Sequence, residues 1–136
     1  MRYFKISLSF ILVLSLIYAF TGKSNLFSSV KQDEGMSVDA FLKKTENKEK
    51  IVFVYFHADW CAPCLKLKPT MEQLTTEEKE KVEIVIIDTD ANKKIAQHFE
   101  INTLPLFYIY KNGKKVWENN TAMSKADLQK KLALYK

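Results

Sequence analysis

The sequence predicts an α/β domain built on a central mixed sheet of four or five strands, with helices on both sides. Continuous apolar runs rich in β-branched and aromatic residues alternate along the chain with segments of helical periodicity. A Lys-Asn-Gly-Lys turn near the C-terminus indicates a closing β-hairpin. The chain has 136 residues, 47% of them hydrophobic, which is the length and composition of one globular domain.

Residues 1–21 are predicted to be a signal peptide or an N-terminal membrane anchor rather than part of this domain. Arg2 and Lys5 precede an uncharged apolar run from Ile6 to Phe20, which is typical of an export signal. As a helix this run would span roughly 22 Å, less than the ~30 Å hydrocarbon core, so cleavage and retention both stay open. The basic residues before the run predict that the domain is exported, to the periplasm or the outer face of the cytoplasmic membrane.

The polar residues 22–35 are predicted to be a tether, and residues 36–136 to form the domain. Its first helix is expected from Val38 to Lys44, because Ser37 can cap that segment. The apolar run from Ile51 to Phe56 predicts a strand that is buried on both faces.

Three more helices and three more strands complete the predicted domain. The helices are expected over Cys64 to about Glu80, over Asn92 to Phe99, and from a Ser124/Asp127 capping box to Tyr135. The strands are expected over Val82 to Ile87, Leu106 to Tyr110 and Lys115 to Glu118. Because helices separate the first three strands, these strands are predicted to pair in parallel, and the hairpin adds an antiparallel edge.

Both cysteines of the chain, Cys61 and Cys64, lie directly after the first strand and at the start of a helix. Backbone N–H groups at a helix N-terminus stabilise an anion, so the thiolate form of Cys61 should be favoured. Cys64 lies one turn further in and can attack a mixed disulfide formed on Cys61. Pro63 suits the first helical turn, where no N–H is required. A nucleophile with a resolving thiol is the arrangement that thiol–disulfide exchange needs.

From about Asp33 to Lys136 the chain resembles the thioredoxin family. The shared motifs are Ala58-Asp59-Trp60-Cys61-Ala62-Pro63-Cys64, Pro69 in the following helix, Thr103-Leu104-Pro105 before a strand, and Lys111-Asn112-Gly113. The resemblance implies a thioredoxin fold, disulfide-containing proteins as substrates, and a cis Pro105 that faces the cysteine pair. No organic cofactor is expected, because the redox-active disulfide carries both electrons. The residues expected to contact the substrate are Trp60, Pro63, Leu104 and Pro105.

The sequence between the cysteines favours a reductase. Ala62-Pro63 is chemically close to the Gly-Pro of reducing thioredoxins, whereas strong oxidants usually place a polar or His residue there. The Ala-Asp-Trp-Cys stretch also looks like the C-terminal domain of membrane thiol:disulfide interchange reductases. We therefore expect a membrane thiol electron donor as partner, and a role in cytochrome c maturation or in the repair of wrong disulfides. A disulfide oxidase of the same fold stays open.

One departure from the thioredoxin pattern concerns the proton of the second cysteine. Thioredoxins carry a buried Asp six residues before the first Cys, which helps to deprotonate the second one. Here this position is Tyr55, and the Lys that partners the Asp in the next strand falls on Ile86. Both residues are expected to lie in the core. Water, Asp59 or His57 would then have to accept the proton of Cys64.

Two other readings of the cysteine pair stay open, and one function class is not expected. Copper or zinc could be held by Cys61, Cys64 and His57. The preferred prediction, however, is that the chain has no metal site. The pair could also form an inert structural disulfide. Nucleic acid is not expected as a partner: the net charge of +5 rests almost wholly on lysine, with Arg2 as the single arginine, whereas nucleic-acid readers rely on arginine.

Overall fold

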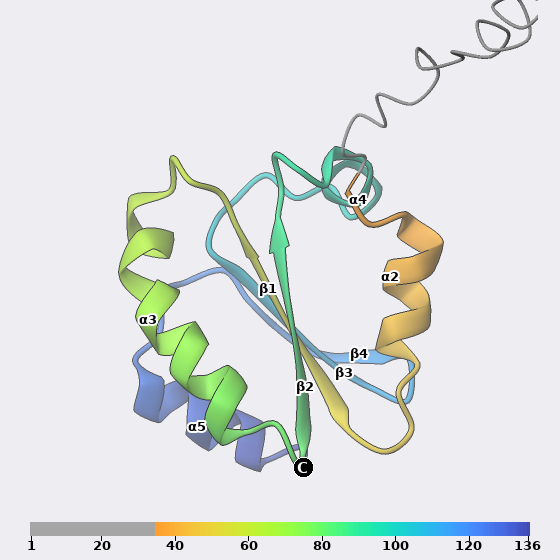
Figure 1. The fold of residues 1–136 in the computed structure, drawn as a ribbon, viewed down its shortest axis with the longest axis vertical. Coiled ribbons are helices and arrows are strands. Elements are labelled where there is room, and N and C mark those ends of the chain that lie inside the picture. The colour runs from red at the N-terminus through yellow and green to blue at the C-terminus, as the bar shows by residue number, and fades with distance from the viewer. Residues whose placement is uncertain (1–34) are drawn as a thin grey trace, which may run out of the picture. The chain divides into compact units, whose positions relative to one another are not determined.

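The computed structural model describes residues 35–136, and within them every predicted helix and strand is present in the predicted order (Figure 1). The helices are α2 (Val38–Thr45), α3 (Ala62–Glu77), α4 (Lys93–His98) and α5 (Lys125–Ala133). The strands are β1 (Ile51–His57), β2 (Val82–Asp88), β3 (Leu106–Lys111) and β4 (Lys114–Asn119). None of these four helices is long and apolar enough to cross a bilayer. The predicted signal or anchor, and the predicted tether up to residue 34, lie outside the described residues.

The four strands form one mixed sheet in the order β2-β1-β3-β4. β1 pairs in parallel with β2 but antiparallel with β3, and β3 pairs antiparallel with β4. The prediction of parallel pairing is therefore wrong for β3. The six residues of α4 span only about 9 Å, too little to carry the chain back along a strand. The helix stays at the end of the sheet where β2 stops, and β3 starts from that same end (Figure 1).

Helices α3 and α5 cover one face of the sheet, and α2 and α4 cover the other (Figure 1). The central strand β1 supplies side chains to both cores, and residues 51–56 are all buried. Phe53 and Tyr55 belong to the core on the α3/α5 face, whereas Val54 and Phe56 belong to the core on the α2/α4 face. The prediction of a strand buried on both faces is confirmed for β1.

Strand β2 is less buried than the sequence predicted, because it lies at the edge of the sheet. Ile86, which was expected in the core, is 44% exposed. It is the neighbour of Tyr55 across the parallel pair and so lies on the α3/α5 face, where α3 leaves it uncovered. The adjacent Ile87 points to the other face and is 2% exposed.

The predicted Asn-Gly turn joins β3 to β4. Asn112 has a φ of 52° and Gly113 a φ of 77°, the left-handed pair that a two-residue type I′ hairpin requires. The Gly113 N–H donates to the Thr45 carbonyl oxygen at 2.9 Å, which ties the hairpin to the end of α2.

Candidate functional site

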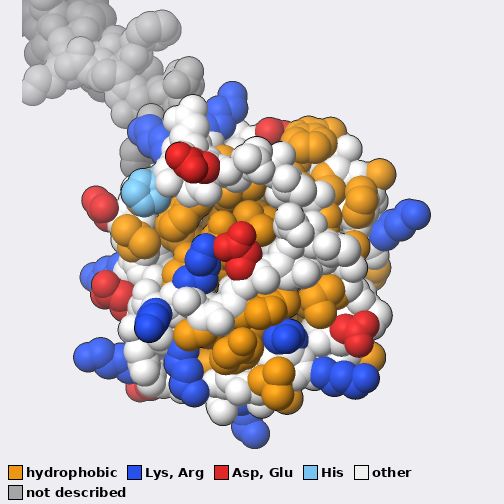
Figure 2. Space-filling view, turned by 180° about the vertical axis from the view of Figure 1, so that it is seen from behind, with side chains coloured by type: hydrophobic (Ala, Val, Ile, Leu, Met, Phe, Trp, Pro, Cys, Tyr) orange, Lys and Arg blue, Asp and Glu red, His pale blue; other side chains and the backbone are white. Residues whose placement is uncertain are grey.

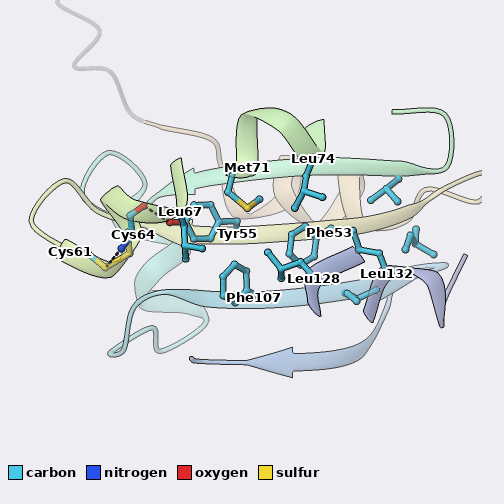
Figure 3. Close-up of a cluster of buried hydrophobic side chains, with 13 residues drawn as sticks. Phe53, Tyr55, Cys61, Cys64, Leu67, Met71, Leu74, Phe107, Leu128 and Leu132 are labelled. Atoms are coloured by element: carbon cyan, nitrogen blue, oxygen red, sulfur yellow. Dashed lines mark hydrogen bonds between the residues drawn. A yellow bond between two sulfur atoms is a disulfide. The ribbon is translucent and has the colours of Figure 1, made fainter. Parts of the chain in front are cut away.

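Cys61 and Cys64 lie at the junction of β1 and α3 and are joined by a disulfide (Figure 3). Cys61 is the N-cap of α3, and its Sγ accepts a hydrogen bond from the Cys64 N–H at 3.3 Å. Since Cys61 takes the capping position, the helix begins at Ala62, two residues earlier than predicted. In the reduced protein an N-cap sulfur faces the free N–H groups of the first helical turn, and these stabilise a thiolate.

The two cysteines differ in their neighbours rather than in their exposure. Cys61 is 4% exposed and Cys64 is 3% exposed. Cys61 follows the exposed Trp60, whereas Cys64 borders a cavity between α3 and the sheet. This arrangement fits attack by Cys61 on a docked disulfide and resolution by Cys64 from the inner side.

Trp60 is 70% exposed. Its indole Nε1–H donates to Asp90 Oδ2 at 3.0 Å, which holds the ring on the surface next to the cysteine pair. Sequence reasoning gave no role to Asp90. Its position in the sequence could have indicated this contact. Asp90 closely follows β2, and the loops after two parallel strands meet at the same edge of a sheet.

The other expected substrate contacts lie at the same end of the sheet. Pro63 is exposed in the first turn of α3. The Leu104–Pro105 peptide bond is cis, and Pro105 is buried directly before β3, whose first residue Leu106 pairs with Phe56. Leu104 is half-buried and packs against the core that includes both cysteines. An exposed aromatic ring, two prolines and a leucine therefore lie at the end of the sheet that carries the disulfide.

A cavity of about 120 Å³ lies against Cys64, between α3 and the β1–β2 side of the sheet. This volume is large enough for a few water molecules. Its lining comes from the end of β1, the following loop, one side of α3 and β2: Tyr55, His57, Ala58, Asp59, Cys64, Leu65, Lys68, Met71, Glu72 and Ile86. The cavity joins the buried thiol position to a set of titratable side chains, and of these Lys68 and Glu72 had no predicted role.

Tyr55 is 2% exposed and fixes the first turn of α3 (Figure 3). Its hydroxyl donates to the Cys64 carbonyl oxygen at 3.2 Å, and its ring stacks on Phe107 at 5.2 Å between centroids. Burial raises the pKa of Tyr55 to about 12. A neutral hydroxyl that already donates to a carbonyl cannot take the proton of Cys64 at neutral pH. The role of this side chain is therefore positional.

The copper or zinc alternative depends on His57 and the two sulfurs lying together. The His57 ring stacks on Tyr55 at 5.5 Å between centroids. Across residues 35–136, no three or more His, Cys, Asp or Glu side chains gather closely enough to hold a metal ion. The two sulfurs are bonded to each other instead.

The cationic side chains that make the chain basic are spread over the surface. Seen from behind, they lie mostly around the rim, with acidic side chains among them and hydrophobic ones across the middle (Figure 2). Several lysines pair with acids, among them Lys115 with Glu118 and Lys125 with Glu77. On this face cationic side chains therefore alternate with acidic and hydrophobic ones (Figure 2).

Comparison with known proteins places these observations in a family. The thioredoxin family model matches residues 33–134. Chloroplastic thioredoxin Y of Oryza sativa subsp. japonica is 36% identical over 83 residues, which cover 61% of this chain and 49% of that protein, so the chain spans about half of its length. Thioredoxin of Ictalurus punctatus is 34% identical over 96 residues, covering 69% of this chain and 90% of that protein. The crystal structure of Malassezia sympodialis thioredoxin superposes with a TM-score of 0.62 and 32% identity, covering 72% of this chain and 84% of that one.

Proposed function

This chain belongs to the thioredoxin family, and on that premise we propose that it is an exported protein-disulfide oxidoreductase that works as a reductase. The Cys61 thiolate attacks one sulfur of a substrate disulfide and releases the other as a thiol. Cys64 then attacks the Cys61 sulfur, which frees the second substrate thiol and leaves the Cys61–Cys64 disulfide. Two electrons pass from the dithiol to the substrate, and the reaction needs no organic cofactor.

The observation that carries the reductase direction is how the Cys61 sulfur is stabilised. Its hydrogen bond comes from the backbone N–H of Cys64, and the intervening Ala62 and Pro63 bring no cation to the first turn of α3. A thiolate that is stabilised much further by charged neighbours makes its disulfide strongly oxidising. Backbone stabilisation alone favours a pair that donates electrons.

The surface around the disulfide supports a protein substrate. Trp60 and Pro63 are exposed next to the buried cysteines. A substrate protein can therefore pack against these two side chains and so bring its own disulfide to Cys61. Leu104 and Pro105 lie at the same end of the sheet and complete the proposed docking surface. An exposed aromatic ring with apolar neighbours is typical of a protein–protein interface.

Export is proposed on the basis of the apolar run from Ile6 to Phe20 and the basic residues before it. Outside the cytosol the protein cannot draw on glutathione or cytosolic thioredoxin reductants. A membrane thiol electron donor would therefore reduce the Cys61–Cys64 disulfide after each turnover. The substrates would be proteins of the same compartment, either apocytochromes c or proteins with wrong disulfides. A reporter fused after Lys31 tests the compartment: export predicts activity outside the cytosol, and activity only inside contradicts it.

The reduction potential of the Cys61–Cys64 pair is the decisive measurement for direction. Equilibration of the full domain with glutathione buffers, followed by Trp60 fluorescence, gives this potential. A value below roughly −220 mV supports a reductase, whereas a value above about −150 mV supports an oxidase. Titration with Cu²⁺ and Zn²⁺ in the reduced protein checks the metal alternative, for which a tight site would be required.

A further inference from the structure

We propose that His57 accepts the proton of Cys64 across the adjoining cavity, through a water molecule, when Cys64 resolves the mixed disulfide. This inference rests on the proposed function, because the step exists only if Cys61 forms a mixed disulfide with a substrate. It assigns a proton acceptor to a site that lacks a buried carboxylate beneath Cys64, where Tyr55 stands.

A proton acceptor beside the cavity would assist the resolving step, because the buried Cys64 borders this cavity. The residue is 3% exposed and borders the cavity of about 120 Å³, whose lining is largely apolar but includes several titratable side chains. A thiol attacks a disulfide only as the thiolate, so its proton must leave before or during the attack. Tyr55 donates its hydroxyl hydrogen to the Cys64 carbonyl oxygen and cannot take a second proton.

Four other titratable side chains line the cavity: His57, Asp59, Lys68 and Glu72. The ordinary pKa values of a thiol, an imidazole and a carboxyl group are about 8.5, 6.5 and 4. The equilibrium constant for proton transfer from a thiol to an imidazole is therefore unfavourable by about 100-fold. For transfer to a carboxylate it is unfavourable by more than about 10,000-fold. A lysine ammonium has no lone pair to offer. Imidazole is the group whose proton affinity suits the task.

The surroundings of His57 hold its ring at the cavity. His57 is half-buried at the end of β1, and its ring stacks on that of Tyr55. The Tyr55 hydroxyl in turn donates a hydrogen bond to the Cys64 carbonyl oxygen. The His57 backbone oxygen accepts hydrogen bonds from the Thr89 N–H at 2.9 Å and the Thr89 hydroxyl at 3.1 Å. Asp88 is its neighbour on β2, but Asp88 Oδ1 accepts from the Asp90 N–H at 2.8 Å.

The charged groups that line the cavity together with His57 are Asp59 on the loop and Lys68 and Glu72 on α3, and all three are exposed. In the balanced step, neutral His57 takes the Cys64 proton and the Cys64 sulfur bonds to the Cys61 sulfur. The bond from Cys61 to the substrate sulfur breaks and releases the substrate thiolate. The imidazolium later returns its proton to solvent or to that thiolate.

Reaction of the reduced protein with a chromogenic aromatic disulfide separates the two steps. Attack by Cys61 releases one coloured thiolate and resolution by Cys64 releases the second, so stopped-flow absorbance shows two phases. His57→Gln should slow the second phase about tenfold to a hundredfold at pH 7 and leave the first phase unchanged. The slow phase of this variant should recover only as the pH rises toward the range in which thiols themselves ionise.

Two further variants distinguish proton transfer from a structural effect. His57→Ala should regain much of the second phase when free imidazole is added, which a merely structural loss would not allow. His98→Gln, which changes the exposed histidine of α4, should leave both phases as in the wild type. An unchanged second phase in His57→Gln, or slowing in Glu72→Gln instead, overturns this inference alone. If the wild type releases no thiolate at all, the proposed function fails and this step with it.

Discussion

The two faces of the sheet are closed in different ways. On the α2/α4 face, Phe41 is fully buried and its ring contacts Phe56, Phe99 and Tyr110, with centroids 5.1 to 6.3 Å apart. On the α3/α5 face the core surrounds the disulfide, but the cavity against it is open and Ile86 at its edge is 44% exposed. The aromatic cluster around Phe41 is closely packed, whereas packing beside the cysteines is incomplete.

This difference indicates that one face mainly contributes stability and the other mainly serves the chemistry of the cysteines. A closed aromatic core contributes stability, because each large buried ring removes apolar area from water and contacts its neighbours at van der Waals distance. A cavity next to Cys64 loses such contacts but lets water and titratable side chains reach a buried thiol. Substitutions that act on one face alone can therefore test whether stability and chemistry are separable in this domain.

The largest effect is expected at the disulfide itself. Cys61→Ser should abolish disulfide exchange, since the attacking sulfur is lost, whereas Cys64→Ser should accumulate a stable mixed disulfide on Cys61. Mass spectrometry after incubation of each reduced variant with a disulfide-containing protein measures both outcomes. Accumulation of an adduct on Cys61→Ser and none on Cys64→Ser would reverse the assigned roles.

On the opposite face, Phe41→Ala should lower the free energy of unfolding by about 3–5 kcal/mol, because it empties the centre of the aromatic core. The rate at which Cys61 attacks a disulfide should not change. Urea unfolding and stopped-flow absorbance measure the two quantities. Leu42→Ala, on the same helix but at a residue 37% exposed, is the matched control and should cost less than about 1 kcal/mol. A large loss of attack rate in Phe41→Ala would show that the faces are coupled.

Sequence patterns predicted the elements of this fold better than their arrangement. The apolar run of β1 and the Asn112-Gly113 turn are local signals, and both predicted structures are present. The direction of β3 was predicted wrongly because periodicity carries no information about which end of the sheet a strand starts from. The exposure of Ile86 was missed for a related reason, since an edge strand and a central strand can have the same composition.

In the candidate site too, features set by residues close in the sequence could be predicted, whereas features that join distant residues could not. Cys61 and Cys64 lie three residues apart beside a predicted helix start, so local order predicts that they are close to each other, although the helix was expected to begin at Cys64 and Cys61 caps it instead. The hydrogen bond from Trp60 to Asp90 joins residues 30 positions apart. The cavity needs β1, β2 and α3 in their final places. Such features depend on the strand order, which the sequence did not predict in full.

Alkaline pH should destabilise both faces through their buried tyrosines. Burial raises the pKa of Tyr55 and of Tyr110 to about 12, above the value of about 10 in an unfolded chain. This stabilisation is fully present below pH 10 and is lost as the pH rises from 10 through 12, by about 2–3 kcal/mol for each residue. Tyr55→Phe and Tyr110→Phe should each flatten the decline of unfolding free energy between pH 9 and 11.5, measured by urea unfolding. A variant curve parallel to the wild type would contradict the assignment for that face.

The smallest effect is expected at the edge of the cavity, where neighbouring isoleucines of β2 allow a matched test of the two faces. Ile86→Ala should lower the free energy of unfolding by only about 0.5–1 kcal/mol, because the side chain already contacts water over 44% of its surface. Ile87→Ala, one residue along and 2% exposed on the α2/α4 face, should cost about 2–5 kcal/mol, since it leaves a buried void. Urea unfolding of both variants measures the difference. Equal losses would mean that the Ile86 side chain is as fully buried on the α3/α5 face as Ile87 is on the α2/α4 face. The proposed route for water to Cys64 would then have to lie elsewhere.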